Sequence, residues 1–448
     1  MSKKANELNL PTVVFFLGFF STTPIITISY KQYDIAVFRV IFYGILMLMI
    51  VNTIQRRFIH MPKYMKGLNL WFLESLFSCL CGWLYFYSIE SEFSRAAFSY
   101  VPKVAVFLLF SLVWGNQESD LLSKCNSKLV KGIFYGCIAN LIWAIIDGFV
   151  FYSFGISINN RLFNGYIQRH NVRYGMLSLV TNSGLFRAAG FNSDPAQVGF
   201  IAPLVMCYGL YKKKPWMIII AILGTLTSAS TTALVSSIVV LMIVIISKKK
   251  PSKKIRGSGL ALIIIIVPII IIILISFKSQ LDYFVNTASE KFFDRVNALY
   301  FESETQSNIR WSYLVYAPIA WFNLSFLGVF GTGFGTASYG YVSDEHILSV
   351  IGQNRKFAYD PENTYVSYLL DTGIIGLIIY LVLTIKLFKY YKRKVNSDCE
   401  FDLIEYSAIL AIFLSMFFYH YILFTPQILF LIAGLSMMSS NNIEVHNK

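Results

Sequence analysis

Arginine side chains are frequent in two long stretches of the sequence, roughly 155–195 and 278–363, where they could bind an anionic ligand. A guanidinium group keeps its charge and offers a planar fork of N–H donors, which suits phosphate and carboxylate groups. For any single arginine, the alternative is surface solubility or contact with lipid headgroups. As a set, the arginines in these stretches and in nearby short segments predict an anionic ligand: Arg39, Arg95, Arg161, Arg169, Arg173, Arg187, Arg295, Arg310 and Arg355.

Two carboxylates lie just before an apolar run that starts near Thr364, and they are candidates for proton transfer. Asp360 and Glu362 would sit at the mouth of a polar pocket if the two long stretches pack together. A carboxylate in such a place can have a shifted pKa and act as a general base. The alternative is that Asp360 and Pro361 begin a helix and that Glu362 satisfies its first-turn amides.

The sequence predicts no cofactor and no metal ion. The string GVFGTGFGTASYG (328–340) is rich in glycine, but dinucleotide binding would require a preceding strand and a following helix in a soluble βαβ unit. Gly331 and Gly333 are instead expected to allow tight turns and a close approach of the backbone to a ligand or the membrane. Histidine, cysteine and aspartate do not cluster at the spacing of metal ligands.

The composition is that of an integral membrane protein. Apolar residues make up 56% of the 448 residues and charged residues only 14%, and the mean hydropathy is +0.59. A soluble chain needs roughly a quarter of its residues charged to cover its surface. The net charge of +14 is therefore read as a sidedness signal rather than as a sign of nucleic-acid binding.

Twelve apolar segments are predicted to cross the membrane as helices, which makes the fold an all-α polytopic membrane protein. The run 216–247 could be one helix, but it lies between two lysine-rich clusters, 212–214 and 248–256. Because both clusters should be cytoplasmic, the run must cross and return, turning at GTLTSAST (224–231). We assign 306–322 to a loop, as a re-entrant or interfacial helix. The predicted spans are 11–29, 35–53, 68–88, 96–114, 129–154, 196–211, 216–228, 231–247, 258–277, 364–386, 401–420 and 423–439.

Charge placement predicts that both termini are cytoplasmic, because the short connections on that side are rich in lysine. The nine arginines then fall outside, and the two long stretches become a first outer loop, 155–195, and a large outer loop, 278–363. The large loop should contain short helices, and residues 1–448 should form one integral membrane domain. The six cysteines fall in predicted spans or on the cytoplasmic side, so no disulfide framework is expected.

Four sequence features occur in an order that resembles the O-antigen polymerase (Wzy) and O-antigen ligase superfamily. The likeness covers about residues 150–390, and the first four spans carry no motif of this kind. The features are FRAAGFNSDPAQVGF (186–200), LTSAST (226–231), NIRWSYLVYAPIAWF (308–322) followed by GVFGTGFG (328–335), and ENTYVSYLLDTGIIGL (362–377).

The resemblance implies a bacterial inner-membrane glycosyltransferase with a GT-C-like helical fold. Such enzymes transfer a glycan from undecaprenyl pyrophosphate at the outer face, rely on outer-loop arginines, and use no nucleotide sugar, metal or other cofactor. The acceptor is another lipid-linked repeat in polymerases and lipid A–core in ligases. Ligases and many relatives have His-Asn before the span that follows the large loop, whereas this chain has Glu362-Asn363. This difference favours the polymerase.

The predicted mechanism assigns roles to both loops. Arg187 and Arg310 stabilise the departing pyrophosphate, and Glu362, with Asp360 behind it, accepts the proton of the attacking sugar hydroxyl. One displacement would invert the anomeric configuration. The predicted substrate-binding residues are Arg295, Arg161, Arg169, Asn363, Tyr365, Asp194, Gly331 and Gly333.

The predicted donor and acceptor are both undecaprenyl-pyrophosphate-linked oligosaccharides, and a chain-length regulator is an expected partner. The product would be O-antigen of lipopolysaccharide, capsule or another exopolysaccharide. Two alternatives stay open: an O-antigen ligase, and a flippase for lipid-linked glycans. A flippase usually shows two similar halves and charged spans. Here no internal repeat is visible, and Glu74, Lys103 and Arg39 are the notable charges in spans.

Overall fold

The computed structural model describes the helical scaffold and parts of the loops. The described residues are 2–30, 33–56, 63–169, 176–180, 186–192, 194–247, 314–344, 347, 363–396, 399–419 and 423–446. The chain packs into two compact units, one formed by residues 1–140 and 310–448 and the other by residues 141–309. The prediction of a single membrane domain and the outer placement of the loops stay predictions.

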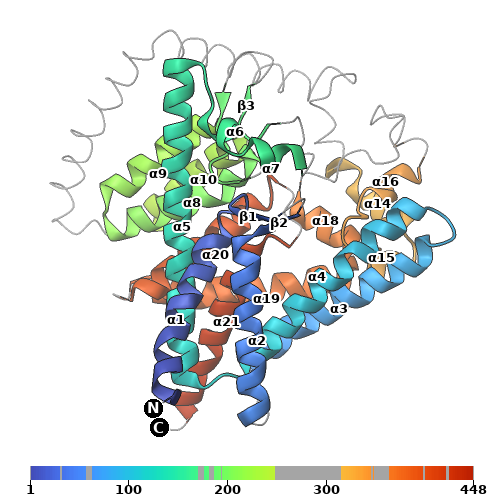
Figure 1. Ribbon diagram of the computed structural model, residues 1–448. Coiled ribbons are helices and arrows are strands. Elements are labelled where there is room, and N and C mark those ends of the chain that lie inside the picture. Colours follow the sequence, from blue (N-terminus) through green and yellow to red (C-terminus); the bar gives the residue numbers. More distant parts are fainter. Residues whose placement is uncertain are drawn as a thin grey trace. The chain divides into compact units, whose positions relative to one another are not determined.

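The first unit is a bundle of helices with one small β-hairpin (Figure 1). Its N-terminal helix α1 packs beside its C-terminal helix α21. Its elements are α1 (Ser2–Ser21), β1 (Thr27–Tyr30), β2 (Tyr33–Ala36), α2 (Val37–Arg56), α3 (Lys63–Phe86), α4 (Ser91–Gly115), the first part of α5 (Ser119–Phe154), α14 (Ala317–Asn323), α15 (Leu327–Phe330), α16 (Tyr339–Val342), α18 (Thr364–Asp371), α19 (Gly373–Lys394), α20 (Glu400–Ser415) and α21 (Thr425–His446).

The second unit continues α5 and adds three apolar helices with short elements between them. Helix α8 packs against both α9 and α10, and the antiparallel strands β3 and β4 pair Val180 with Phe186. Its further elements are α6 (Ile158–Leu162), α7 (Asn164–Arg169), β3 (Leu179–Val180), β4 (Phe186–Arg187), the 3-10 helix η2 (Pro195–Gln197), α8 (Val198–Lys212), α9 (Pro215–Ser228) and α10 (Thr231–Ser247).

The helices confirm a multi-pass helical membrane protein, although they do not establish the number of crossings. Among the described residues, five helices are long and apolar enough to cross a membrane: α2, α3, α4, α5 and α19. Shorter apolar segments lie at Leu10–Ser21, Pro215–Ser228, Thr232–Val244 and Thr425–Met438. The predicted span 258–277 lies outside the described residues.

The turn predicted within 216–247 is confirmed. Helix α9 ends at Ser228, and α10 begins at Thr231. Between them Ala229 adopts a left-handed conformation with φ 43°. Since a left-handed residue cannot continue a right-handed helix, the apolar run is two helices rather than one.

Two predicted spans differ from the structure. Helix α1 ends at Ser21, and residues 27–29 of the predicted span 11–29 belong to strand β1, which pairs with β2. The predicted span 364–386 is divided at Thr372, which caps α18, and Gly373 begins α19 with φ +67°. A continuous helix and an interrupted one can have the same apolar composition. Composition alone therefore did not reveal where these two predicted spans are broken.

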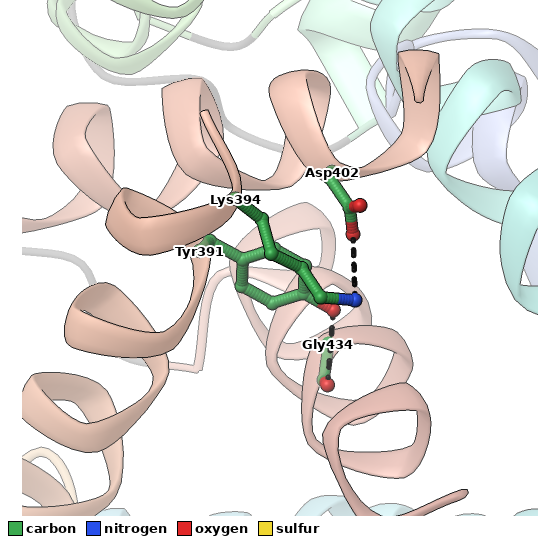
Figure 2. A network of polar contacts seen from close by, with 4 residues as sticks. All are labelled: Tyr391, Lys394, Asp402 and Gly434. Carbon is green, nitrogen blue, oxygen red and sulfur yellow. Dashed lines mark hydrogen bonds and ion pairs between the residues drawn. The ribbon is translucent and has the colours of Figure 1, made fainter. Parts of the chain in front are cut away.

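The C-terminal helices of the first unit are joined by polar contacts at one end of α19 (Figure 2). The Lys394 ammonium lies 3.7 Å from the Asp402 carboxylate of α20. The hydroxyl of the fully buried Tyr391 donates to the Gly434 carbonyl of α21 at 3.2 Å. These contacts fix α20 and α21 against the end of α19.

Candidate functional site

The glycine string forms a buried loop that packs on the break between α18 and α19. Gly331, Gly333 and Gly335 all have positive φ, at 89°, 94° and 79°, a conformation that glycine adopts at little cost. The Thr332 amide donates to the Leu370 carbonyl at 3.2 Å, and the Gly333 amide donates to the Asp371 carbonyl at 2.8 Å. We call residues 331–336 the glycine loop.

The amides of the glycine loop hold a carboxylate of the same chain. Asp371 is fully buried. Its Oδ1 accepts from the Thr336 amide at 3.1 Å, and its Oδ2 from the Gly335 amide at 3.4 Å. These bonds supply the partners that a buried carboxylate requires. Asp371 was not among the predicted site residues, although it lies in the Leu-Asp-Thr-Gly stretch (370–373) of the motif at 362–377.

Helix α3 supports the other side of the glycine loop. The Gly333 amide donates to the Ser78 hydroxyl at 3.1 Å, and that hydroxyl donates to the Asp371 carbonyl. A Cβ on Gly82 would overlap the Thr332 carbonyl oxygen. The loop therefore crosses α3 at a position where a side chain would collide with its backbone.

Asn363 lies at the start of α18 and caps it. Its side-chain oxygen accepts from the Tyr365 amide at 3.0 Å and from the Val366 amide at 3.1 Å, and its Nδ2 donates to the Phe417 carbonyl at 3.1 Å. The Tyr365 hydroxyl donates to the Phe413 carbonyl at 3.1 Å. The cap of the helix is thus Asn363, whose side chain satisfies two of the first-turn amides.

In the second unit, two motifs that are far apart in the sequence come together. The Ala188 amide, next to Arg187, donates to the Thr227 carbonyl at 2.9 Å. Phe186 stacks on Phe151 of α5, with ring centroids 4.1 Å apart and planes at 8°. Arg187 therefore lies on a strand anchored on both sides, next to the turn between α9 and α10.

A buried carboxylate on α5, Asp147, organises the segment that follows it. It accepts from the Ser178 hydroxyl at 2.6 Å, the Ser157 hydroxyl at 3.0 Å and the Asn159 amide at 3.1 Å. The Asn159 side chain in turn donates to the Gly190 carbonyl at 2.9 Å. Sequence reasoning missed Asp147, although an aspartate inside a predicted span is a signal of a buried polar contact.

The predicted site residues are divided between the two units, and some lie outside the described residues. Arg161 is exposed on α6, Arg169 ends α7, and Asp194 caps η2, where its carboxylate accepts from the Ala196 amide at 2.7 Å. The structure thus places Arg161, Arg169, Arg187 and Asp194 in the second unit, and Gly331, Gly333, Asn363 and Tyr365 in the first. The predicted residues outside the described part are Glu362, Asp360, Arg310 and Arg295.

The segment from α9 to the first half of α19 matches a known family. Residues 216–381 match the model of the family described as O-antigen ligase. This match confirms the predicted resemblance. It includes the turn after α9, the glycine loop, Asn363 and Asp371, whereas Arg187 and Asp147 lie before it. A search among curated proteins finds no match to the chain.

Proposed function

We propose that the protein is a bacterial oligosaccharide repeat-unit polymerase that joins undecaprenyl-pyrophosphate-linked glycans at the outer face of the cytoplasmic membrane. The observation that carries the proposal is the match of residues 216–381 to the O-antigen ligase family, whose members are membrane enzymes that act on lipid-linked glycans. This chain has Glu362-Asn363 at the position where the ligases of the superfamily it resembles have His-Asn. This difference favours the polymerase reaction.

In the proposed reaction a sugar hydroxyl of the acceptor attacks the anomeric carbon of the donor glycan. The bond from that carbon to the pyrophosphate oxygen breaks, and the configuration inverts. Glu362 takes the hydroxyl proton, with Asp360 as the second candidate. Arg187 and Arg310 stabilise the negative charge of the departing pyrophosphate, helped by Arg295, Arg161 and Arg169.

The position of Arg187 supports its role. A donor stabilises a developing charge best when it is held in place before the reaction. The stacking of Phe186 on Phe151 and the bond from Ala188 to Thr227 hold the backbone on both sides of Arg187. The loss of such a donor typically slows the chemical step by about 10²–10³.

Glycan polymerisation in membranes that contain the full-length protein tests these roles. Arg187→Ala should lower the rate of chain growth by about 10²-fold or more, and Glu362→Gln by about 10²–10⁴-fold, at normal protein levels. Arg393→Ala, which removes an exposed arginine from the end of α19, is the control and should leave the rate unchanged. If Arg187→Ala and Arg310→Ala both retain normal chain growth, the leaving-group assignment is wrong.

A ligase is the second candidate, because the matching family is described by that activity. Deletion of the gene distinguishes the two reactions. Loss of a polymerase leaves single repeats on the final acceptor, whereas loss of a ligase leaves none. A flippase is distinguished by the purified protein, because an enzyme lengthens lipid-linked repeats in detergent and a flippase has no measurable effect without a bilayer.

A further inference from the structure

Helices α2 and α4 of the first unit run side by side in the same direction. Phe42 of α2 contacts Phe110 of α4, with ring centroids 4.7 Å apart. Further along α2, the Thr53 hydroxyl accepts from the side chain of Gln117, two residues beyond the end of α4, at 3.2 Å. Residues of α2 are therefore matched to residues 64 to 68 positions later, which puts Arg39 near the level of Lys103, where α2 begins.

Arg39 and Lys103 form an exposed pair of like charges, which we call the basic pair. Both side chains are exposed, and they are close enough for their charges to interact. Among the described side chains, neither forms an ion pair with a carboxylate. Lys103 lies about 18 Å along α4 from Ser91, at 1.5 Å per residue, which places it well inside the apolar helix. Two adjacent cations in such a segment repel each other unless an anion binds between them.

The basic pair adjoins the glycine loop through one aromatic side chain. The Lys103 ammonium lies 4.0 Å from the centroid of the Tyr100 ring. That ring is 5.9 Å from the ring of Phe334, and a Cβ on Gly335 would lie 3.1 Å from it. The basic pair therefore lies next to the glycine loop, which belongs to the segment that matches the family.

The surface next to Arg39 suits an apolar chain. Tyr43 and Met47 follow Arg39 at intervals of four residues, so the three share one face of α2, and Tyr43 and Met47 are 50% and 65% exposed. A Cβ added at the neighbouring Gly44 would meet nothing within 4 Å, so the surface there is open. A phosphate group bound by the basic pair could thus continue into a tail lying along α2.

We propose that Arg39 and Lys103 bind the pyrophosphate of a polyprenyl-linked glycan that enters from the bilayer, next to the glycine loop. This inference rests on the proposed function, since that function requires such a lipid. The chemistry that the basic pair recognises is a phosphate headgroup, and guanidinium and ammonium groups together supply the donors for it. Tyr100 connects the basic pair to the glycine loop, which lies within the family match.

Binding of tritiated undecaprenyl pyrophosphate to the full-length protein in phosphatidylcholine nanodiscs tests the site without turnover. Arg39→Gln and Lys103→Gln should each weaken binding by about tenfold, the loss expected for one charge-assisted hydrogen bond. The double variant should weaken it further. Arg39→Lys with Lys103→Arg keeps both charges and should retain most of the affinity. Lys392→Gln with Arg393→Gln removes the same charge from the end of α19 and should have no effect.

Unchanged affinity in the Arg39→Gln, Lys103→Gln double variant overturns the proposal. Displacement of the probe by phosphatidylglycerol as effective as that by unlabelled undecaprenyl pyrophosphate also overturns it, because the pair would then be a contact for bulk anionic lipid. The proposed function fails separately if the wild-type protein binds the probe through the basic pair but does not lengthen lipid-linked glycans.

Discussion

Gly82 is the residue at which α3 and the glycine loop come closest. A Cβ there would overlap the Thr332 carbonyl oxygen, which belongs to the loop backbone and cannot rotate away. A side chain at this position therefore acts on the whole loop, including the amides that hold Asp371. Gly44 on α2, by contrast, has open space around it.

We expect Gly82→Ala to displace the glycine loop. The free energy of unfolding should fall by about 1–3 kcal/mol, as for overpacking in a core, and glycan transfer should be lost. Gly44→Ala should leave stability unchanged or slightly raised, because alanine favours helix. Thermal unfolding of both variants in detergent measures the difference, and equal melting temperatures for the two would contradict the observed packing.

Asp371 should be important for stability because its buried carboxylate accepts from two backbone amides, those of Gly335 and Thr336. Asp371→Ala leaves the Gly335 and Thr336 amides without this acceptor and should cost about 3 kcal/mol. Asp371→Asn keeps one acceptor oxygen and should cost about 1 kcal/mol. The order of the two melting temperatures is the measurement. An alanine variant as stable as the wild type would show that these hydrogen bonds contribute nothing.

At the scale of the element, α18 depends on its cap. Asn363 holds the Tyr365 and Val366 amides and also reaches the Phe417 carbonyl. Asn363 is predicted from the sequence to bind substrate, and that role stays a prediction beside the cap that the structure shows.

Two substitutions of Asn363 separate capping from substrate binding. Asn363→Ala should destabilise the protein by about 1 kcal/mol, the usual cost of a lost cap. Asn363→Ser keeps a capping oxygen and should restore stability. If the serine variant is as stable as the wild type but transfers glycan slowly, Asn363 also binds substrate. Recovery of both properties would assign it to capping alone.

In the molecule as a whole, each of the two units has a polar anchor built on a buried aspartate, Asp147 in one and Asp371 in the other. Asp147 holds Ser157, Asn159 and Ser178 in the second unit, whereas Asp371 and Ser78 hold the glycine loop in the first. The catalytic assignments of the proposed function fall in both units. A substitution at Asp147 should therefore disturb the second unit, and one that displaces the glycine loop should disturb the first.

Hydrogen exchange should show this separation. Asp147→Ala removes the acceptor of three donors and should increase amide exchange in 157–169, 176–180 and 186–192, while the amides of Gly335 and Thr336 remain protected. Gly82→Ala should do the reverse. Exchange that rises equally in both regions for either variant would mean that the two units are not independently anchored.

Several features were determined by the sequence alone. A bilayer offers no hydrogen-bond partners, so long apolar runs must form helices that satisfy their own backbone, and α2, α3, α4, α5 and α19 follow from this. The lysine clusters on both sides of 216–247 predicted the turn that Ala229 makes. The motif order predicted the family that matches residues 216–381.

The tertiary structure alone decided what the polar residues inside the scaffold do. The bonds that define the glycine loop join Thr336 to Asp371, 35 residues apart, and Gly333 to Ser78, 255 residues apart. The register that puts Arg39 beside Lys103 likewise depends on how two separate helices pack. Periodicity and composition report local preferences, whereas these partners are chosen by the folding of distant segments against each other. The arginines could be recognised by type, but the partners of the carboxylates Asp147 and Asp371 could be identified only from the tertiary structure.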